Sequence, residues 1–168
     1  MIKVCFTLFS LLFSFSVIAQ KTADEFIKSG NSKEDVKDFK GALADYNQAV
    51  MLEPENSEAL YYRGFVKTRM QDFGNAITDF DLALALDTES VELYYCRGNA
   101  NFELKNYSTA IEDYNKAIFL DPTDKESYYN RAIAKYNLGQ RESACKDLQM
   151  AIKNGDHEAT AVFIELCH

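Results

Sequence analysis

Apolar and polar residues recur with a helical period along most of the chain. Between residues 94 and 120, two sets of positions spaced three and four apart are separated by the short polar break at residues 105–107. This spacing is typical of amphipathic helices, because 3.6 residues make one turn. It predicts two helices joined by a tight turn. The shared faces are Tyr94, Arg97, Gly98 and Asn101 on the first helix, and Ala110, Tyr114, Ala117 and Leu120 on the second.

The same pattern occurs four times at a spacing of 34 residues, without an insertion from residue 23 to residue 158. A constant period of this length is typical of stacked units, each too small to bury its own apolar face. We therefore predict antiparallel helix pairs at 23–56, 57–90, 91–124 and 125–158. The recurring positions include Ala42, Ala76, Ala110 and Ala144; Asp45, Asp79, Asp113 and Asp147; and Gly30, Gly64 and Gly98, with Ala132 as the fourth.

Small and large residues alternate in a way that fits close helix packing. Glycine or alanine lets two helix backbones approach, while a large ring at Tyr46, Phe80 or Tyr114 fills the space beside them. Pro54 and Pro122 stand just past the second helices, where proline prevents the helix from continuing. The period and the packing pattern therefore agree on where each unit ends.

These residues resemble the tetratricopeptide repeat (TPR), which has an aromatic, Leu-Gly and Tyr in its first helix, and Ala, an aromatic, Ala and a closing Pro in its second. The fullest matches are LYYRGFVKTRMQDFGNAITDFDLALALD and LYYCRGNANFELKNYSTAIEDYNKAIFLDP. The resemblance implies an all-α fold, a right-handed α-solenoid of four TPR helix hairpins. After them we predict a capping helix at 157–167, because a solenoid exposes its last apolar face unless something covers it.

TPR arrays usually bind peptides or helices along the groove formed by their first helices. The resemblance therefore implies a protein-binding groove with a column of tyrosines beside a column of glutamates. Aromatic rings favour binding and carboxylates favour basic partners, but the tyrosines could instead simply pack between helices. The implied groove residues are Glu58, Tyr61, Phe65, Glu92, Tyr95, Asn99, Phe102, Glu126, Tyr129, Ile133 and Tyr136.

Some TPR proteins grip the terminal carboxylate of a peptide with Lys, Asn and Arg side chains. Asn99 and Asn130 match the asparagine positions of that clamp, but Tyr95 and Glu126 stand where lysines are needed. We therefore expect no carboxylate clamp. The net charge of −8 over 168 residues, from 26 acidic and 18 basic side chains, likewise argues against nucleic acid and for a neutral or basic protein partner.

The first nineteen residues have the three parts of a secretory signal peptide. One positive charge at Lys3 precedes an apolar run from Val4 to Ile18, and the small residue Ala19 follows. We expect cleavage near Ala19, export to the periplasm or beyond the cell, and no membrane span in the mature chain. The alternative is an uncleaved membrane anchor, although the run is short for a bilayer.

Three cysteines follow this segment. Cys145 lies at the start of the second helix of the fourth repeat, and Cys167 ends the predicted cap. Antiparallel packing of these two helices would place the two cysteines opposite one another. An oxidising compartment would then let them form a disulfide; the alternative is two small buried residues. No basic cluster accompanies Cys96 to activate it as a nucleophile.

Enzyme chemistry is not indicated. The two histidines, at 157 and 168, belong to no cluster, and no glycine-rich phosphate loop follows a strand. Arg63, Arg97 and Arg131 also recur at the repeat period, and we expect them to pair with the recurring aspartates as part of the stacking rather than as a ligand site. We predict no catalytic, cofactor-binding or metal-binding residues.

The sequence therefore predicts an exported, non-catalytic TPR adaptor or scaffold that binds another protein through an aromatic and acidic groove. The alternative is a structural subunit of a cell-envelope complex that associates with copies of itself.

Overall fold

The computed structural model describes residues 21–167, and within that range it contains nine α-helices and no strand. The expected signal peptide lies outside the described residues. The helices are α1 (Ala23–Asp35), α2 (Phe39–Leu52), α3 (Ser57–Arg69), α4 (Phe73–Leu86), α5 (Val91–Glu103), α6 (Tyr107–Leu120), α7 (Lys125–Asn137), α8 (Arg141–Lys153) and α9 (Ala159–Cys167).

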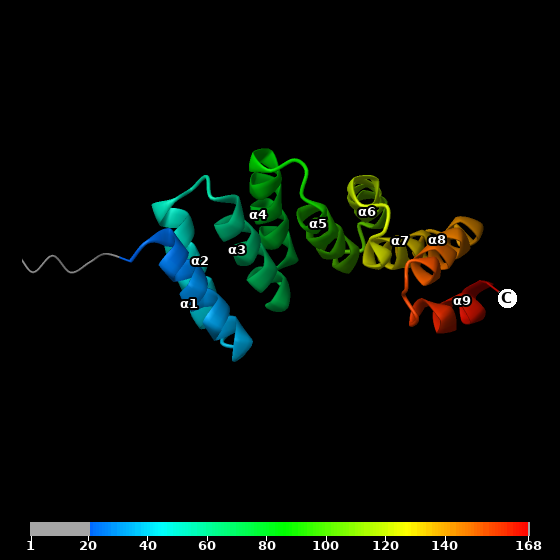
Figure 1. Ribbon diagram of the computed structural model, residues 1–168, viewed down its shortest axis with the longest axis horizontal. Coiled ribbons are helices and arrows are strands. Elements are labelled where there is room, and N and C mark those ends of the chain that lie inside the picture. Colours follow the sequence, from blue (N-terminus) through cyan, green and yellow to red (C-terminus); the bar gives the residue numbers. More distant parts are fainter. Residues whose placement is uncertain (1–20, 168) are drawn as a thin grey trace, which may run out of the picture.

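The helices form four successive pairs that follow one another along an elongated body, with α9 at the far end (Figure 1). Each pair lies within one of the four predicted repeats. The first helices of neighbouring pairs also contact one another, α1 with α3, α3 with α5 and α5 with α7. The first helices therefore form a continuous row along the body, and the architecture is the α-solenoid that the sequence predicted.

In each helix pair, a small residue of the first helix packs against a large residue of the second. A Cβ atom added to Gly64 would lie 2.8 Å from the ring of Phe80, and one added to Gly98 would lie 2.8 Å from the ring of Tyr114. In the fourth pair the same place holds Ala132, with Leu148 as the large residue of the second helix. The fourth pair accommodates the extra methyl group because its partner has no ring.

The predicted arginine–aspartate pairs are present in the last three repeats. Arg63 Nη2 lies 2.6 Å from Asp79 Oδ1, and the equivalent distances from Arg97 to Asp113 and from Arg131 to Asp147 are also 2.6 Å. Each of these ion pairs joins the two helices of one repeat. In the first repeat, which has Ser29 in place of arginine, Lys33 Nζ pairs with Asp45 at 2.5 Å.

Two of these arginines also connect neighbouring repeats, and one of them is Arg131, whose Nη1 donates a 2.6 Å hydrogen bond to Asn115 Oδ1 on the preceding α6. The Arg97 guanidinium contacts Asp113 on α6 and, at 2.6 Å, Asp81 on the preceding α4. These two carboxylates raise the pKa of Arg97 against the opposing effect of burial. The interaction fixes the stacking of the second and third pairs.

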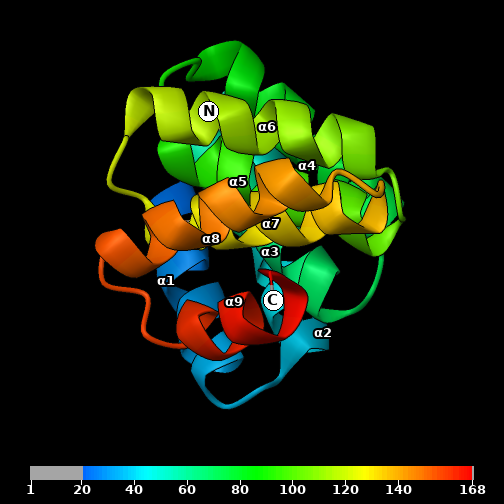
Figure 2. The same cartoon turned by 90° about the vertical axis from the view of Figure 1, so that its right-hand side faces the viewer.

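Helix α9 packs beside α8 at the C-terminal end of the solenoid, and Figure 2 shows it below α8. Val162 and Phe163 pack against the cluster that contains Leu148 and Ala151. The sequence predicted this helix at 157–167, but it begins at Ala159 because the carboxylate of Asp156 accepts hydrogen bonds from the backbone N–H groups of Glu158 and Ala159 and ends the turn there.

The cap is held by a covalent bond as well as by packing. Cys145 on α8 and Cys167 on α9 form a disulfide, with their Cα atoms 5.8 Å apart. Nearby, Arg141 Nε donates a 2.6 Å hydrogen bond to the carbonyl oxygen of Leu166. Both contacts hold the C-terminal end of α9 against the start of α8.

Candidate functional site

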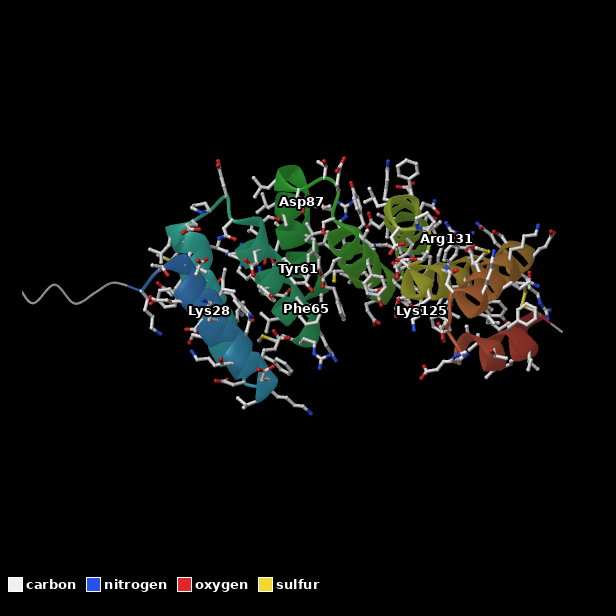
Figure 3. All side chains as sticks on the ribbon, viewed as in Figure 1. Lys28, Tyr61, Phe65, Asp87, Lys125 and Arg131 are labelled. Carbon is white, nitrogen blue, oxygen red and sulfur yellow. A yellow bond between two sulfur atoms is a disulfide. The ribbon has the colours of Figure 1, made fainter. Side chains whose placement is uncertain are left out.

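The first helices α3, α5 and α7 carry the residues that the sequence assigned to the groove. Glu58, Glu92 and Glu126 are exposed, whereas Tyr61, Tyr95 and Tyr129 are half-buried. Figure 3 shows Tyr61 and Phe65 on the same helix, α3, where their ring centres lie 6.0 Å apart with 29° between the ring planes. The tyrosines therefore pack between helices with part of each side chain and leave the rest accessible.

The tyrosine and glutamate columns are not independent. The Tyr61 hydroxyl donates a 2.5 Å hydrogen bond to Glu92 Oε1, which joins α3 to α5 across two repeats. Burial and this hydrogen bond both raise the pKa of the Tyr61 hydroxyl, so the bond holds a neutral phenol against a carboxylate. Glu92 is thus already occupied within the protein, which the repeat spacing could not reveal.

A polar network lies beneath the middle of the groove. Asn99 Oδ1 accepts hydrogen bonds from the Tyr114 hydroxyl at 2.7 Å and from Asn130 Nδ2 at 2.9 Å. Asn130 Nδ2 also lies 3.3 Å from the Tyr95 hydroxyl oxygen. Burial raises the pKa of Tyr95. The network joins α5, α6 and α7 and holds the Tyr95 hydroxyl in place.

Three cavities follow the row of first helices. The N-terminal cavity, of about 430 Å³, lies between α1 and α3 and is lined in part by Asn31, Glu34, Tyr61 and Phe65. The middle cavity, of about 460 Å³, lies between α3 and α5. Its lining includes Phe39, Phe65, Arg69, Phe73, Tyr95, Asn99 and Glu103.

The cap cavity, of about 520 Å³, is formed where α5 and α7 meet the turn between α8 and α9. Its lining is Tyr95, Lys125, Glu126, Tyr129, Asn130, Gly155, Asp156, His157 and Glu158. Phe65 lines both the N-terminal and the middle cavity, and Tyr95 lines both the middle and the cap cavity. The three cavities are therefore consecutive parts of one groove.

Six of the predicted groove residues line these cavities: Tyr61, Phe65, Tyr95, Asn99, Glu126 and Tyr129. The other five, Glu58, Glu92, Phe102, Ile133 and Tyr136, line none of the three. The Phe102 ring instead packs edge-on against Tyr107 at 5.3 Å, and both rings lie against the buried cluster of Ala110, Tyr114 and Ala134.

Sequence reasoning missed the groove residues that come from outside the first helices. Phe39 begins α2, and the Arg69 guanidinium lies 5.6 Å from the centre of its ring. A signal for Phe39 was available, because Phe73 and Tyr107 follow it at the repeat period. Asp156 and Glu158 in the turn before the cap had no comparable signal.

Within residues 21–167, no helix is long and apolar enough to cross a membrane. The same range contains no group of three or more histidine, cysteine or acidic side chains placed to hold a metal ion.

Comparison with known proteins identifies the class. A TPR repeat family model matches residues 98–139, and a tetratricopeptide repeat model matches residues 126–154. No curated protein sequence matches the chain. Together with the helix pairs, these family matches support a tetratricopeptide-repeat protein.

Solved structures of TPR proteins have the same fold. The crystal structure of MamA is 25% identical, with a TM-score of 0.77 over 82% of this chain and 81% of MamA. A thermophilic TPR protein of Thermus thermophilus is 18% identical, with a TM-score of 0.72 over 86% of this chain and 81% of its own. The first TPR of Spaghetti (RPAP3), bound to the HSP90 peptide SRMEEVD, is 24% identical, with a TM-score of 0.69 over 70% of this chain and 94% of its own.

Proposed function

We propose that this protein is a non-catalytic adaptor that binds an extended segment of another protein along the groove of its first helices. The observation that carries the proposal is the sharing of walls: Phe65 joins the first two cavities and Tyr95 joins the last two. An extended segment can place successive side chains in consecutive cavities, which an isolated pocket would not allow.

The composition of the groove suits this role. Aromatic rings offer a large contact area and lose little conformational freedom on binding. Here Tyr61 is already held by the hydrogen bond that it donates to Glu92, and the Tyr95 hydroxyl by the one that it accepts from Asn130. Because these side chains are already ordered in the free protein, less conformational entropy is lost on binding, and this favours affinity.

The charge of the groove supports a neutral or basic partner. The RPAP3 domain is bound to a peptide that ends in Glu-Glu-Val-Asp. In this chain, three acidic residues line the cap cavity, together with two residues of basic type; they are Glu126, Asp156 and Glu158, and Lys125 and His157. Like charges oppose binding, so we propose that the ligand is not an acidic chain terminus.

We propose further that the chain acts outside the cytoplasm, after removal of its first nineteen residues. The Cys145–Cys167 disulfide supports this location, because disulfides persist in oxidising compartments. Mass spectrometry of the protein from its source cells would test it, with a chain beginning at Gln20 expected. A chain that retains Met1 or Ile2 would contradict cleavage.

The test of the groove uses two variants that each remove one phenyl ring. Phe65→Gln changes the wall between two cavities, whereas Phe119→Gln changes a ring on α6 that is 80% exposed and lines none of the three. The native chain and both variants would be immobilised and exposed to an extract of the source cells, after their circular dichroism and melting temperatures have been matched. We expect a partner that the native chain and Phe119→Gln retain and that Phe65→Gln loses.

Equal retention by all three proteins would contradict groove binding. Recovery of the chain itself as the sole bound protein, with a mass in light scattering that rises with concentration, would favour the self-associating structural subunit.

A further inference from the structure

We infer that the cap cavity receives a lysine or arginine side chain of the bound segment, so that the turn before α9 forms part of the binding site; this inference rests on the proposed function. The sequence assigned no role to that turn beyond leading into the cap. The structure places it beside Tyr95 of α5 and Tyr129 of α7.

Two aromatic side chains form the walls of the cavity. Tyr95 and Tyr129 are both half-buried, and both line it. A cation is attracted to the face of a tyrosine ring within about 6 Å of its centre, and guanidinium and ammonium groups both use this contact. The protein already contains such contacts elsewhere, since Arg97 lies 5.6 Å from the ring centre of Tyr94, and Arg131 lies 5.3 Å from that of Tyr128.

Carboxylates stand at the mouth of the same cavity. Glu126 and Glu158 are both exposed, and Glu126 comes from the first turn of α7 while Glu158 comes from the turn before α9. The Asp156 carboxylate is engaged in capping α9. The cavity therefore pairs aromatic walls with two carboxylates from different elements, which is complementary to one long basic side chain.

The cation already present is a weak competitor. Lys125 Nζ lies 3.8 Å from Glu126 Oε1, and about half of each side chain is accessible, at 41% and 54%. An exposed ion pair of this length contributes little, so Lys125 can turn away at low cost. Figure 3 labels Lys125, which is the first residue of α7 and lines the cap cavity.

Other side chains fit this cavity less well. A carboxylate would be repelled by Glu126 and Glu158, and an apolar side chain would remove water from them without replacing their hydrogen bonds. The middle cavity differs, because Phe39, Phe65 and Phe73 line it. The bound segment is thus expected to place an apolar side chain in the middle cavity and a basic one in the cap cavity.

The turn is held firmly enough to contribute to a site. Asn154 Nδ2 donates a 3.2 Å hydrogen bond to the carbonyl oxygen of Pro122, which ties the turn to the one before α7. At its other end, α9 is fixed by the Cys145–Cys167 disulfide. Glu158 is therefore presented by a braced segment.

The test is a positional-scanning library of synthetic peptides with acetylated and amidated ends, in which one position at a time is fixed as lysine, arginine, leucine or glutamate. Binding to the full chain would be compared with binding to a Glu126→Gln, Glu158→Gln double variant. We expect a preference for lysine or arginine over glutamate at one position, and a loss of about fivefold or more in affinity for those peptides in the double variant.

A control variant carries the same change of charge elsewhere. Glu89→Gln, Glu112→Gln alters two exposed glutamates that line none of the three cavities, and we expect it to keep the preference.

A second measurement concerns the ring of Tyr129. Tyr129→Leu should weaken binding of the basic peptides, and Tyr129→Phe should restore it, whereas a merely structural role would affect leucine-containing peptides equally.

The outcomes separate the two proposals. Peptide binding that depends on Phe65 but shows no preference for lysine or arginine, or a preference lost equally in the control variant, would overturn the basic cavity and leave groove binding intact. Binding that is equal in the native chain and in Phe65→Gln, or no peptide binding at all, would overturn both.

Discussion

Ala132 and Leu148 occupy in the fourth helix pair the places that a glycine and an aromatic ring occupy in the first three. Both side chains are fully buried. The exchange is physically coupled, because the ring of Phe80 or Tyr114 leaves no room for a methyl group opposite it. A methyl group at the first place therefore requires a residue smaller than these rings at the second.

This coupling predicts what happens when the alanine and leucine of the fourth helix pair replace the glycine and the aromatic ring of the second. Gly64→Ala should destabilise the protein by about 1–3 kcal/mol through overpacking, and Phe80→Leu by about 1–2 kcal/mol through a cavity. The double variant should cost less than the sum, by about 1 kcal/mol or more, in chemical denaturation. Gly74→Ala is the control, since a Cβ there meets nothing within 4 Å; additive single effects would contradict the coupling.

The turns between the helices of each pair store a small and testable strain. Lys37, Gln71 and Lys105 have φ values of 62°, 63° and 62°, and the equivalent fourth position is Gly139, with φ of 76°. A residue with a side chain loses about 1 kcal/mol of folded-state stability in this left-handed region. Glycine avoids that cost, but part of the gain is offset because glycine loses more backbone entropy on folding. Lys105→Gly should therefore stabilise the protein by about 0.5–1 kcal/mol.

The opposite change is the natural control. Gly139→Ala should destabilise by a similar amount, measured in the same denaturation series. If both substitutions shift the midpoint in the same direction, backbone strain at these positions is not the cause.

The cap disulfide should contribute measurably to stability. Cys145 and Cys167 are 22 residues apart, and a loop of this size corresponds to about 3 kcal/mol in the chain-entropy account. Dithiothreitol should lower the melting temperature of the native chain and leave that of a Cys145→Ala, Cys167→Ala variant unchanged. Intact mass before and after reduction checks the bond itself; an unchanged mass would mean that the thiols are free.

Cys96 should be unreactive while the protein is folded. Burial raises the pKa of its thiol to about 12, with Glu92 adding to the shift. The thiolate is the reactive form, so at a pH of about 8.5 iodoacetamide should label Cys96 only after unfolding. Rapid labelling of the folded chain would contradict the burial.

The same shift has a defined sign for stability. Because the folded state holds the Cys96 proton more tightly than the unfolded state, its contribution is present below the ordinary thiol pKa of 9.0 and is lost as the pH rises towards 12. Urea midpoints at about pH 8 and about pH 11 should therefore converge for the native chain and Cys96→Ala as the pH increases. Parallel curves would refute this linkage.

The fold followed from sequence because each repeat is a local unit. The period fixed the number and order of the helix pairs, and the recurrence of arginine and aspartate indicated their pairing, as in Arg63 with Asp79. The cap helix begins two residues later than the expected boundary because the side chain of Asp156 ends the turn, an effect of one hydrogen-bonded residue that no periodic pattern contains.

The groove was harder to predict, since its residues come from several elements. Repeat register placed Glu92 and Phe102 on it, but Glu92 is bonded to Tyr61 and Phe102 packs on Tyr107. Conversely, Glu158 reaches the groove because the chain turns back after α8, a tertiary event without a signature in local spacing.

Tyr95 is a wall common to the middle and cap cavities, and its position is set by Asn130. A ligand that occupies both cavities must therefore pass a fixed partition, and the distance between its two anchoring side chains has to match the distance across that ring. Two peptides of identical composition would then differ in affinity according to the number of residues between their anchors. The groove would then select a motif by the spacing of its anchoring side chains as well as by their chemistry.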